Sequence, residues 1–155
     1  MSFRIFAAVA AVATLAAAPM SAVFADRPTA GVKPIVEVVE QLEKQGYGPF
    51  SEVSFDDGDW EVEVYKDGVA YELAVDGRTG KVLSEYRDDA EARPPRDAQP
   101  LSQILGLILK AGYTDIEDAS FERRYWEVEA YRDGLKYEIL IHPTSGEIVS
   151  QRRDD

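Results

Sequence analysis

The sequence contains no cysteine and a single histidine, His142, among its 155 residues. Without cysteine the chain can form no disulfide bond, no thiolate metal site and no cysteine nucleophile. One histidine is also too few for a histidine-rich zinc site, and no glycine-rich phosphate-binding loop is present. Because His142 precedes Pro143 in an expected turn, we interpret it as a surface residue rather than a catalytic base. These absences predict a protein that is not an enzyme and that needs no cofactor.

Positive charge is scarce in this chain. Lys and Arg number 17 against 29 Asp and Glu, which gives a formal net charge of −12 at pH 7. Nucleic-acid binding requires clustered basic residues, so we expect no nucleic-acid partner. Anionic membrane surfaces are disfavoured for the same reason. The protein is therefore acidic. Its hydrophobic fraction of 45% nevertheless indicates that it is globular.

The first 25 residues are typical of a signal peptide. Arg4 precedes an alanine-rich apolar run over residues 5–18, and Pro19 ends that run. Small residues follow, so we expect cleavage between Ala25 and Asp26. A retained membrane anchor is the alternative, which the weak apolarity of alanine disfavours. An exported acidic protein without disulfides fits a bacterial periplasmic or secreted location, with no stable membrane anchor after cleavage.

The string "WEVEVYKDGVAYEL", which begins at Trp60, returns as "WEVEAYRDGLKYEI", which begins at Trp126. The two halves align without a gap, and roughly 20 of 56 positions are identical, which predicts a tandem duplication. The Pro-rich and charged stretch between the copies is typical of a linker. The predicted order is a signal peptide, an N-terminal tail, a first repeat, a linker and a second repeat, over residues 1–25, 26–33, 34–89, 90–99 and 100–155.

Each repeat is predicted to hold one helix followed by four short strands. The helix begins after Pro34 or Pro100 and carries an apolar stripe, and Gly46 or Gly112 ends it. The predicted fold class is α+β: two tandem repeats, each with one helix packed on an antiparallel four-stranded β-meander. The strands are expected at residues 51–55, 60–66, 69–75 and 81–86, and again at 117–121, 126–132, 135–141 and 147–152.

The register of the central hairpin follows from its two-residue turn, Asp67-Gly68. With this turn Val64 lies opposite Tyr71, and Trp60 lies on the same apolar face. We therefore expect Trp60 and its equivalent Trp126 to be core residues beneath the helices, rather than an exposed aromatic platform.

The same register places like charges opposite each other, Glu63 facing Glu72 and Glu129 facing Glu138. Such pairs cost a few tenths to about 1 kcal/mol each. They form a solvated acidic face, a docking surface for a basic protein, or a divalent-cation site for calcium built from these four glutamates. On a flat sheet face with no predicted cleft, acid–base catalysis is not expected. The candidate partner-binding residues are Glu61, Glu63, Glu72, Glu127, Glu129 and Glu138.

The second helix is apolar nearly all round, because Leu107 and Leu109 replace Gln41 and Glu43 of the first. A helix of this kind must be covered on more than one side. We expect Leu107 and Leu109 to contact the other repeat, or else a partner protein or a second copy in a homodimer.

Four features recur in the same order in both copies. They are a helix that ends in Gly-Tyr, the string "WEVE" with a following "DG", then the string "YEL" or "YEI", and finally the string "TGKVL" or "SGEIV". This pattern resembles the PepSY family. The resemblance implies a small exported α+β module, similar in layout to the tandem fold of a secreted beta-lactamase inhibitor protein. PepSY modules also occur in metallopeptidase propeptides, where they restrain the enzyme. No peptidase follows Asp155, so an inhibitory role is expected to act in trans, on an envelope protein such as a peptidase.

Overall fold

The computed structural model describes residues 26–89 and 92–154, and the expected signal peptide lies outside these residues. No helix among them is long and apolar enough to cross a membrane. The elements are α1 (Ile35–Lys44), β1 (Phe50–Asp56), β2 (Asp59–Lys66), β3 (Val69–Asp76), β4 (Val82–Arg87), α2 (Leu101–Lys110), β5 (Thr114–Glu122), β6 (Tyr125–Arg132), β7 (Leu135–Ile141) and β8 (Ile148–Arg153).

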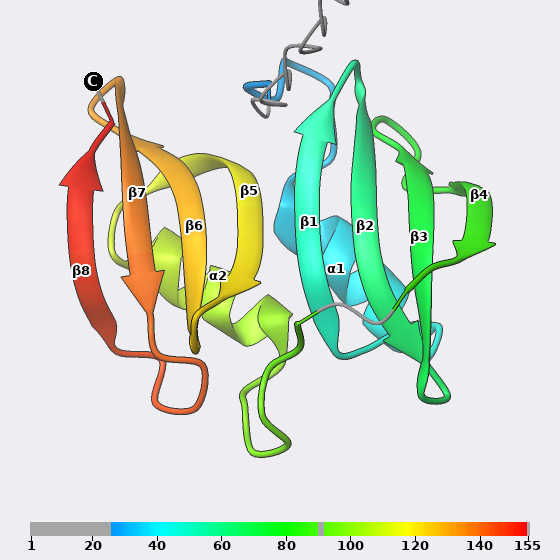
Figure 1. Ribbon diagram of the computed structural model, residues 1–155. Coiled ribbons are helices and arrows are strands. Elements are labelled where there is room, and N and C mark those ends of the chain that lie inside the picture. Colours follow the sequence, from blue (N-terminus) through cyan, green and yellow to red (C-terminus); the bar gives the residue numbers. More distant parts are fainter. Residues whose placement is uncertain (1–25, 90–91, 155) are drawn as a thin grey trace, which may run out of the picture.

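All the strands form one antiparallel sheet in the order β4-β3-β2-β1-β5-β6-β7-β8. Both helices lie on one side of this sheet, and its other side is open (Figure 1). The predicted α+β class is confirmed, since each half of the chain contributes one helix and four consecutive antiparallel strands.

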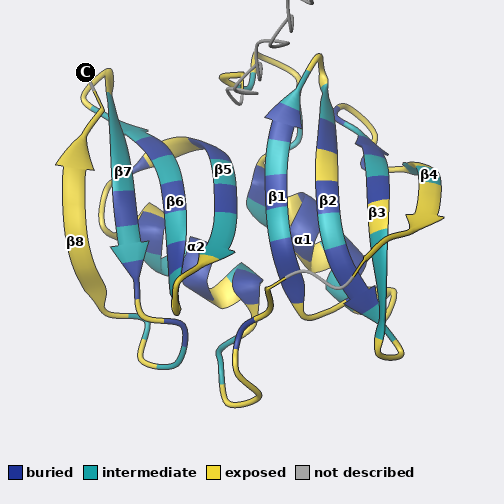
Figure 2. Ribbon diagram, viewed as in Figure 1, coloured by how far each residue is buried: buried dark blue, intermediate teal, exposed yellow. Residues whose placement is uncertain are grey.

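The two halves meet where β1 pairs with β5. Val53 lies opposite Ala119 at the centre of this seam, with Glu52 opposite Ser120 and Ser54 opposite Asp118. Without the seam β1 and β5 would each be an exposed edge, and unpaired edges tend to associate. The pairing therefore merges two meanders into an eight-stranded sheet, whose remaining outer strands β4 and β8 are mostly exposed (Figure 2).

The hairpin turns adopt the conformation that their residues favour. Asp67 and Gly68 both have positive φ, 50° and 78°, and Asp133 and Gly134 repeat this with 53° and 77°. Two consecutive positive φ values define a type I′ turn, whose twist matches that of the strands. The predicted register is confirmed in both hairpins, where Glu63 lies opposite Glu72 in the first and Ala130 opposite Tyr137 in the second.

The core lies between the helices and the sheet. Trp60 and Trp126 are 0% and 1% exposed, so both are core residues as predicted. The apolar stripe of α1 covers the first half of the sheet, and that of α2 covers the second. The residues that these stripes bury are Ile35, Val38, Val39, Leu42, Leu101, Ile104, Leu105 and Ile108.

Segments that precede the two helices cross from one half to the other. Arg27 forms an ion pair of 2.6 Å with Asp115 and stacks 4.1 Å above the ring centroid of Tyr131, in the second half. Arg93 lies 5.2 Å above the ring of Tyr65, in the first half. The expected tail and linker therefore both contact the opposite half and help to hold the halves together.

Candidate functional site

Carboxylates gather on the open face of the sheet. In β2 the buried Val62 and Val64 alternate with Glu61 and Glu63, so these glutamates point away from the helices. The same alternation applies on the neighbouring strands. We call the resulting surface the acidic face, which consists of Glu52, Glu61, Glu63, Glu72, Asp118, Glu127, Glu129 and Glu138.

The structure places all of the sequence-predicted glutamates on this face and adds Glu52 and Asp118. Glu52 lies opposite Glu63 on β2, and Asp118 lies opposite Glu129 on β6. Both added residues belong to the strands of the seam, so only the pairing of β1 with β5 joins the two acidic clusters. Strand alternation could have assigned them to the open side, but the sequence carried no signal for the seam itself.

Asp118 has the most perturbed carboxyl group of the acidic face. Its pKa is raised to about 8, mainly by burial and also by the nearby charges of Glu52, Glu129 and Glu127. At pH 7 this side chain is therefore mainly protonated, and the centre of the face can take up more negative charge at higher pH.

Glu61 and Glu127 have raised pKa values for the same two reasons. Burial is the largest cause in each case. Neighbouring carboxylates add to it, Glu72 beside Glu61 and Glu138 beside Glu127. The acidic face is thus crowded enough to oppose its own ionisation.

Two basic residues compensate the acidic face in the second half. Lys136 Nζ lies 2.6 Å from Glu129 Oε2 and also pairs with Glu117, a carboxylate that is only 1% exposed. Although burial alone lowers the pKa of Lys136, its hydrogen bonds with the two glutamates raise it. Arg152 donates to Glu138 Oε2 at 2.6 Å. Here the side chains of Glu129 and Glu138 already hold cationic partners.

The first half has uncharged residues at the corresponding positions. Ala70 stands where the second half has Lys136, Tyr86 where it has Arg152, and Ser51 where it has the buried Glu117. Lys136 and Arg152 therefore have no basic counterparts at the equivalent positions of the first half. The sequence analysis had predicted opposed glutamate pairs in both halves and had not considered their cationic partners.

The open face is hollowed over β6 and β7, whereas the sequence predicted a flat surface. A cavity of about 550 Å³ is lined there by Glu127, Glu138 and Arg152, together with Tyr125 and Leu140. It offers a paired arginine and carboxylate beside an aromatic ring, a combination suited to recognising a polar surface group.

His142 accepts hydrogen bonds from the backbone of the turn that follows it. Its Nδ1 accepts the backbone N–H groups of Thr144 at 3.3 Å and Ser145 at 3.2 Å. Asp76, the equivalent residue of the first half, accepts the N–H groups of Arg78 and Thr79 in the same way. His142 therefore holds a turn, which fits its interpretation as a turn residue.

The two leucines of α2 have different surroundings. A Cβ placed on Gly146 would clash with Leu107 Cδ1, so Leu107 lies over a turn of its own half. Leu109 is 41% exposed and lines a cavity with Ile35 and Val36 of the first half. The described contacts thus place Leu109 at the junction between halves and Leu107 within the second half.

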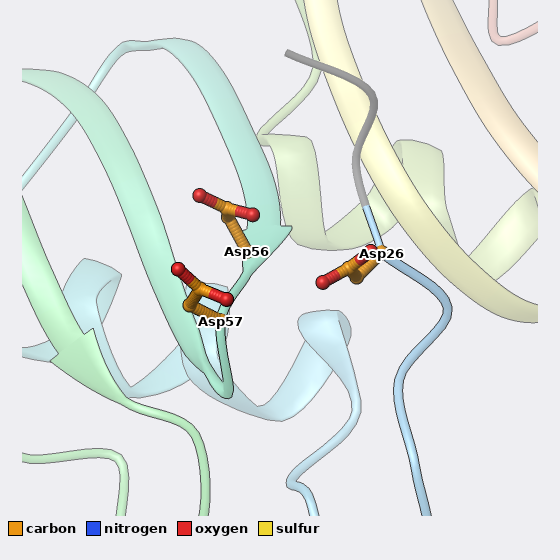
Figure 3. Close-up of side chains that lie close together, drawn as sticks. All are labelled: Asp26, Asp56 and Asp57. Carbon is orange, nitrogen blue, oxygen red and sulfur yellow. The ribbon is translucent and has the colours of Figure 1, made fainter.

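A separate group of aspartates lies near the start of the described chain. The carboxylates of Asp26, Asp56 and Asp57 come within 4.8 Å of one another (Figure 3). Among the described residues, the glutamates considered for calcium binding do not form such a group. The three aspartates are exposed or half-buried, and exposed acidic groups of this kind are common without a metal.

The sequence matches the peptidase propeptide and YPEB domain family over residues 5–86 and 88–152. None of the curated proteins matches it. A putative lipoprotein from Clostridium difficile 630 has a similar structure, with 12% identity and a TM-score of 0.46 over 84% of this chain and 99% of the other.

Two other solved structures are similar to this chain at lower scores. The YpeB C-terminal domain of Bacillus megaterium shows 9% identity and a TM-score of 0.32, over 84% of this chain and 69% of that domain. A BLIP-like protein from Bacteroides fragilis NCTC 9343 shows 10% identity and a TM-score of 0.30, over 79% and 87% of the two chains.

Proposed function

The chain belongs to the peptidase propeptide and YPEB domain family, and we propose that it is a non-catalytic binding protein of the bacterial envelope. In this proposal the acidic face docks on a basic surface of a partner protein. The family description refers to peptidase propeptides, so a peptidase is the first class of partner to test.

The crowding of carboxylates on the open face is the observation that carries the proposal. Like charges in directly opposed positions destabilise a sheet. After burial, neighbouring carboxylates are a further cause of the raised pKa values of Asp118, Glu61 and Glu127, which supports such repulsion on this face. A cationic partner would relieve this repulsion on binding, and complementary charge also speeds association and selects partners.

Location and the absence of catalysis have separate support. The N-terminal 25 residues are typical of a signal peptide, and the chain has no cysteine that would need oxidation after export. The single histidine already accepts two backbone N–H groups in a turn. Both arguments favour an exported binding module over an enzyme.

Calcium binding by the paired glutamates is less favoured. A calcium ion takes six to eight oxygen ligands, most of which must come from carboxylates and carbonyl groups. Lys136 and Arg152 already hold Glu129 and Glu138, and a cation would have to displace them.

The test is capture of partners from an envelope extract at low and high salt. One bait is the protein itself, and a second carries Glu63→Gln, Glu72→Gln, Glu129→Gln and Glu138→Gln. We expect the first bait alone to retain a basic partner, and high salt to release it because screening weakens exposed charge pairs. A captured peptidase would then be assayed for activity with and without the protein.

The matched control removes the same number of charges elsewhere. Glu40→Gln, Glu147→Gln, Asp88→Asn and Asp89→Asn alter exposed residues outside the acidic face. Docking on the acidic face requires this control bait to retain the partner as the wild type does. Equal loss with both variants would reduce the effect to net charge and would overturn the proposal.

A further inference from the structure

A second surface, independent of the acidic face, has the form of a small-molecule site. A cavity of about 540 Å³ lies between the Pro-rich segment that precedes α2 and the connection from α1 to β1. We call it the linker pocket. Its volume falls in the range of about 300–1,000 Å³ that is usual for ligand sites. Its apolar wall includes Tyr47, Phe50, Pro94, Pro95, Leu101 and Trp126.

The equivalent cavity of the other half shows what is special about the linker pocket. That cavity has a volume of about 270 Å³ and is lined by Val32 and Asp115, where the linker pocket has Ala98 and Pro49. The smaller Ala98 side chain leaves more space. Each cavity is lined by one carboxylate, Glu43 in the linker pocket and Asp115 in its counterpart, and Arg93 and Arg96 also line the linker pocket. The linker pocket is therefore larger than its counterpart and has a more basic lining.

A buried hydrogen-bond donor in the wall of the linker pocket has no acceptor. In the first half Trp60 Nε1 donates to the carbonyl oxygen of Lys33 at 3.2 Å. The equivalent Trp126 is 1% exposed, and its Nε1 has no partner among the described residues. Gln99, the equivalent of Lys33, also lines the pocket. Since a buried donor without an acceptor destabilises the protein, this N–H favours a ligand that brings an oxygen atom.

The charged groups of the linker pocket select the sign of that ligand. Arg93 and Arg96 both line it, in a chain whose net charge is −12. One carboxylate, that of Glu43, also lines it and accepts from Ser102 N at 3.2 Å and Ser102 Oγ at 2.6 Å. Two guanidinium groups against one carboxylate favour a single negative charge over a dianion. Guanidinium and carboxylate groups also match in geometry.

We propose that the linker pocket binds a small amphipathic carboxylate. The apolar body of the ligand packs against the prolines and the rings of Phe50 and Trp126, where it replaces water on apolar surface. Its oxygen atoms accept hydrogen bonds from Trp126 Nε1 and from the guanidinium groups of Arg93 and Arg96. Because residues of both halves form the walls, an occupied pocket would also stabilise the junction between them.

The experiment uses the two tryptophans as paired reporters. The ¹⁵N-labelled protein, expressed as the full chain, has two indole N–H resonances, which Trp60→Phe assigns. Octanoate is the probe, and octanamide and acetate are its neutral and short-chain controls. We expect octanoate to shift the Trp126 resonance saturably and to leave that of Trp60 in place. Octanamide should bind about tenfold more weakly, because it lacks the charge that pairs with arginine.

Variants separate the linker pocket from general hydrophobic binding. Arg96→Gln should weaken octanoate binding about tenfold, whereas Arg87→Gln removes the same charge from the edge strand β4 and should have no effect. Ala98→Val copies Val32 of the smaller cavity and should abolish the shift. An unchanged Trp60 resonance shows in each case that the variant is folded.

Three results would overturn the proposal. The first is no shift of either resonance at millimolar octanoate, and the second is an equal shift of both. The third is that Arg96→Gln and Arg87→Gln weaken binding by the same factor. In the first case the linker pocket holds only water, and in the other two octanoate binds without using it.

Discussion

At the scale of single residues, the pKa of a carboxyl group in this protein depends on residues of strands that are distant in sequence. The pKa of Asp118 is raised by its own burial and then by Glu52, on β1, and Glu129, on β6. Glu52 reaches Asp118 only because β1 pairs with β5. The same aspartate on an isolated meander would lose that neighbour and part of its burial.

Replacing Asp118 by Asn should flatten the dependence of stability on pH. The pKa is about 8 in the folded protein against an ordinary 3.8, so between these values the folded state holds a proton that the unfolded chain releases. The free energy of unfolding therefore falls as pH rises from about 4 to about 8, by at most about 1.4 kcal/mol per pH unit from this group. Asp118→Asn removes this contribution, which urea unfolding at a series of pH values measures. The exposed Asp88→Asn is the control, and equal slopes in wild type and Asp118→Asn would contradict the prediction.

The contribution of the buried ion pair between Glu117 and Lys136 to stability can be tested with a single variant and a second substitution that restores stability. Lys136→Ala leaves a nearly inaccessible carboxylate without its cation, and we expect a loss of about 3 kcal/mol in the free energy of unfolding. Adding Glu117→Ser reproduces the Ser51 and Ala70 combination of the first half and should recover most of that loss. Chemical denaturation of the single and double variants measures both effects. If the double variant were no more stable than Lys136→Ala, the buried pair would not be the cause.

At the scale of elements, turns and helix ends follow local rules in both halves. The hairpins place two positive φ values at Asp-Gly, and both helices are followed by a glycine with φ near 90°, Gly46 and Gly112. α2 differs from α1 in carrying an interior glycine, Gly106. This glycine weakens a helix that packs on half of the sheet.

One substitution at two glycines should have opposite effects. A Cβ at Gly106 meets no atom within 4 Å, so Gly106→Ala should stabilise the protein by about 0.5–1 kcal/mol through helix propensity. A Cβ at Gly134 is equally unobstructed, but its φ of 77° is unfavourable for alanine. Gly134→Ala should therefore destabilise by about 1–2 kcal/mol. Urea unfolding of both variants provides the comparison, and a change of the same sign in both would refute the backbone argument.

At the scale of the whole molecule, three kinds of contact join the halves. β1 pairs with β5, Glu43 of α1 accepts two hydrogen bonds from Ser102 of α2, and Arg27 and Arg93 each reach the opposite half. The contacts distribute the junction over the sheet, the helices and the flanking segments. Each half thus depends on the other to cover one edge of its meander.

We expect the two halves to unfold in a single cooperative transition. Each half contains one tryptophan, so the indole N–H resonances of Trp60 and Trp126 report on the halves separately. Because the seam and the helix contacts are lost together, both native resonances should disappear with the same midpoint in a urea titration. Two distinct midpoints would mean that the halves are independent folding units, and the junction would then be a weak contact between domains.

The local features were accessible from the sequence alone. Alternation with a period of two determined which side of each strand is buried, and the Asp-Gly turns determined the hairpin register that opposes Glu63 to Glu72. The apolar stripes placed both helices, and the buried tryptophans followed from the same register. Such features depend on neighbours within a few residues, or across one tight turn, so the chain specifies them directly.

The features on which the two proposed binding roles depend required the tertiary structure. The seam, the raised pKa of Asp118, the compensation of Glu129 and Glu138 by Lys136 and Arg152, and the linker pocket all join residues from separate elements. In a repeated sequence each copy carries the same local signals, so no local pattern states which edges of the two copies will meet. The structure pairs β1 with β5, and Glu43 and the crossing arginines join the halves beside that seam. Two similar meanders thus become one molecule in which the charge pairing and the equivalent pockets differ between the halves.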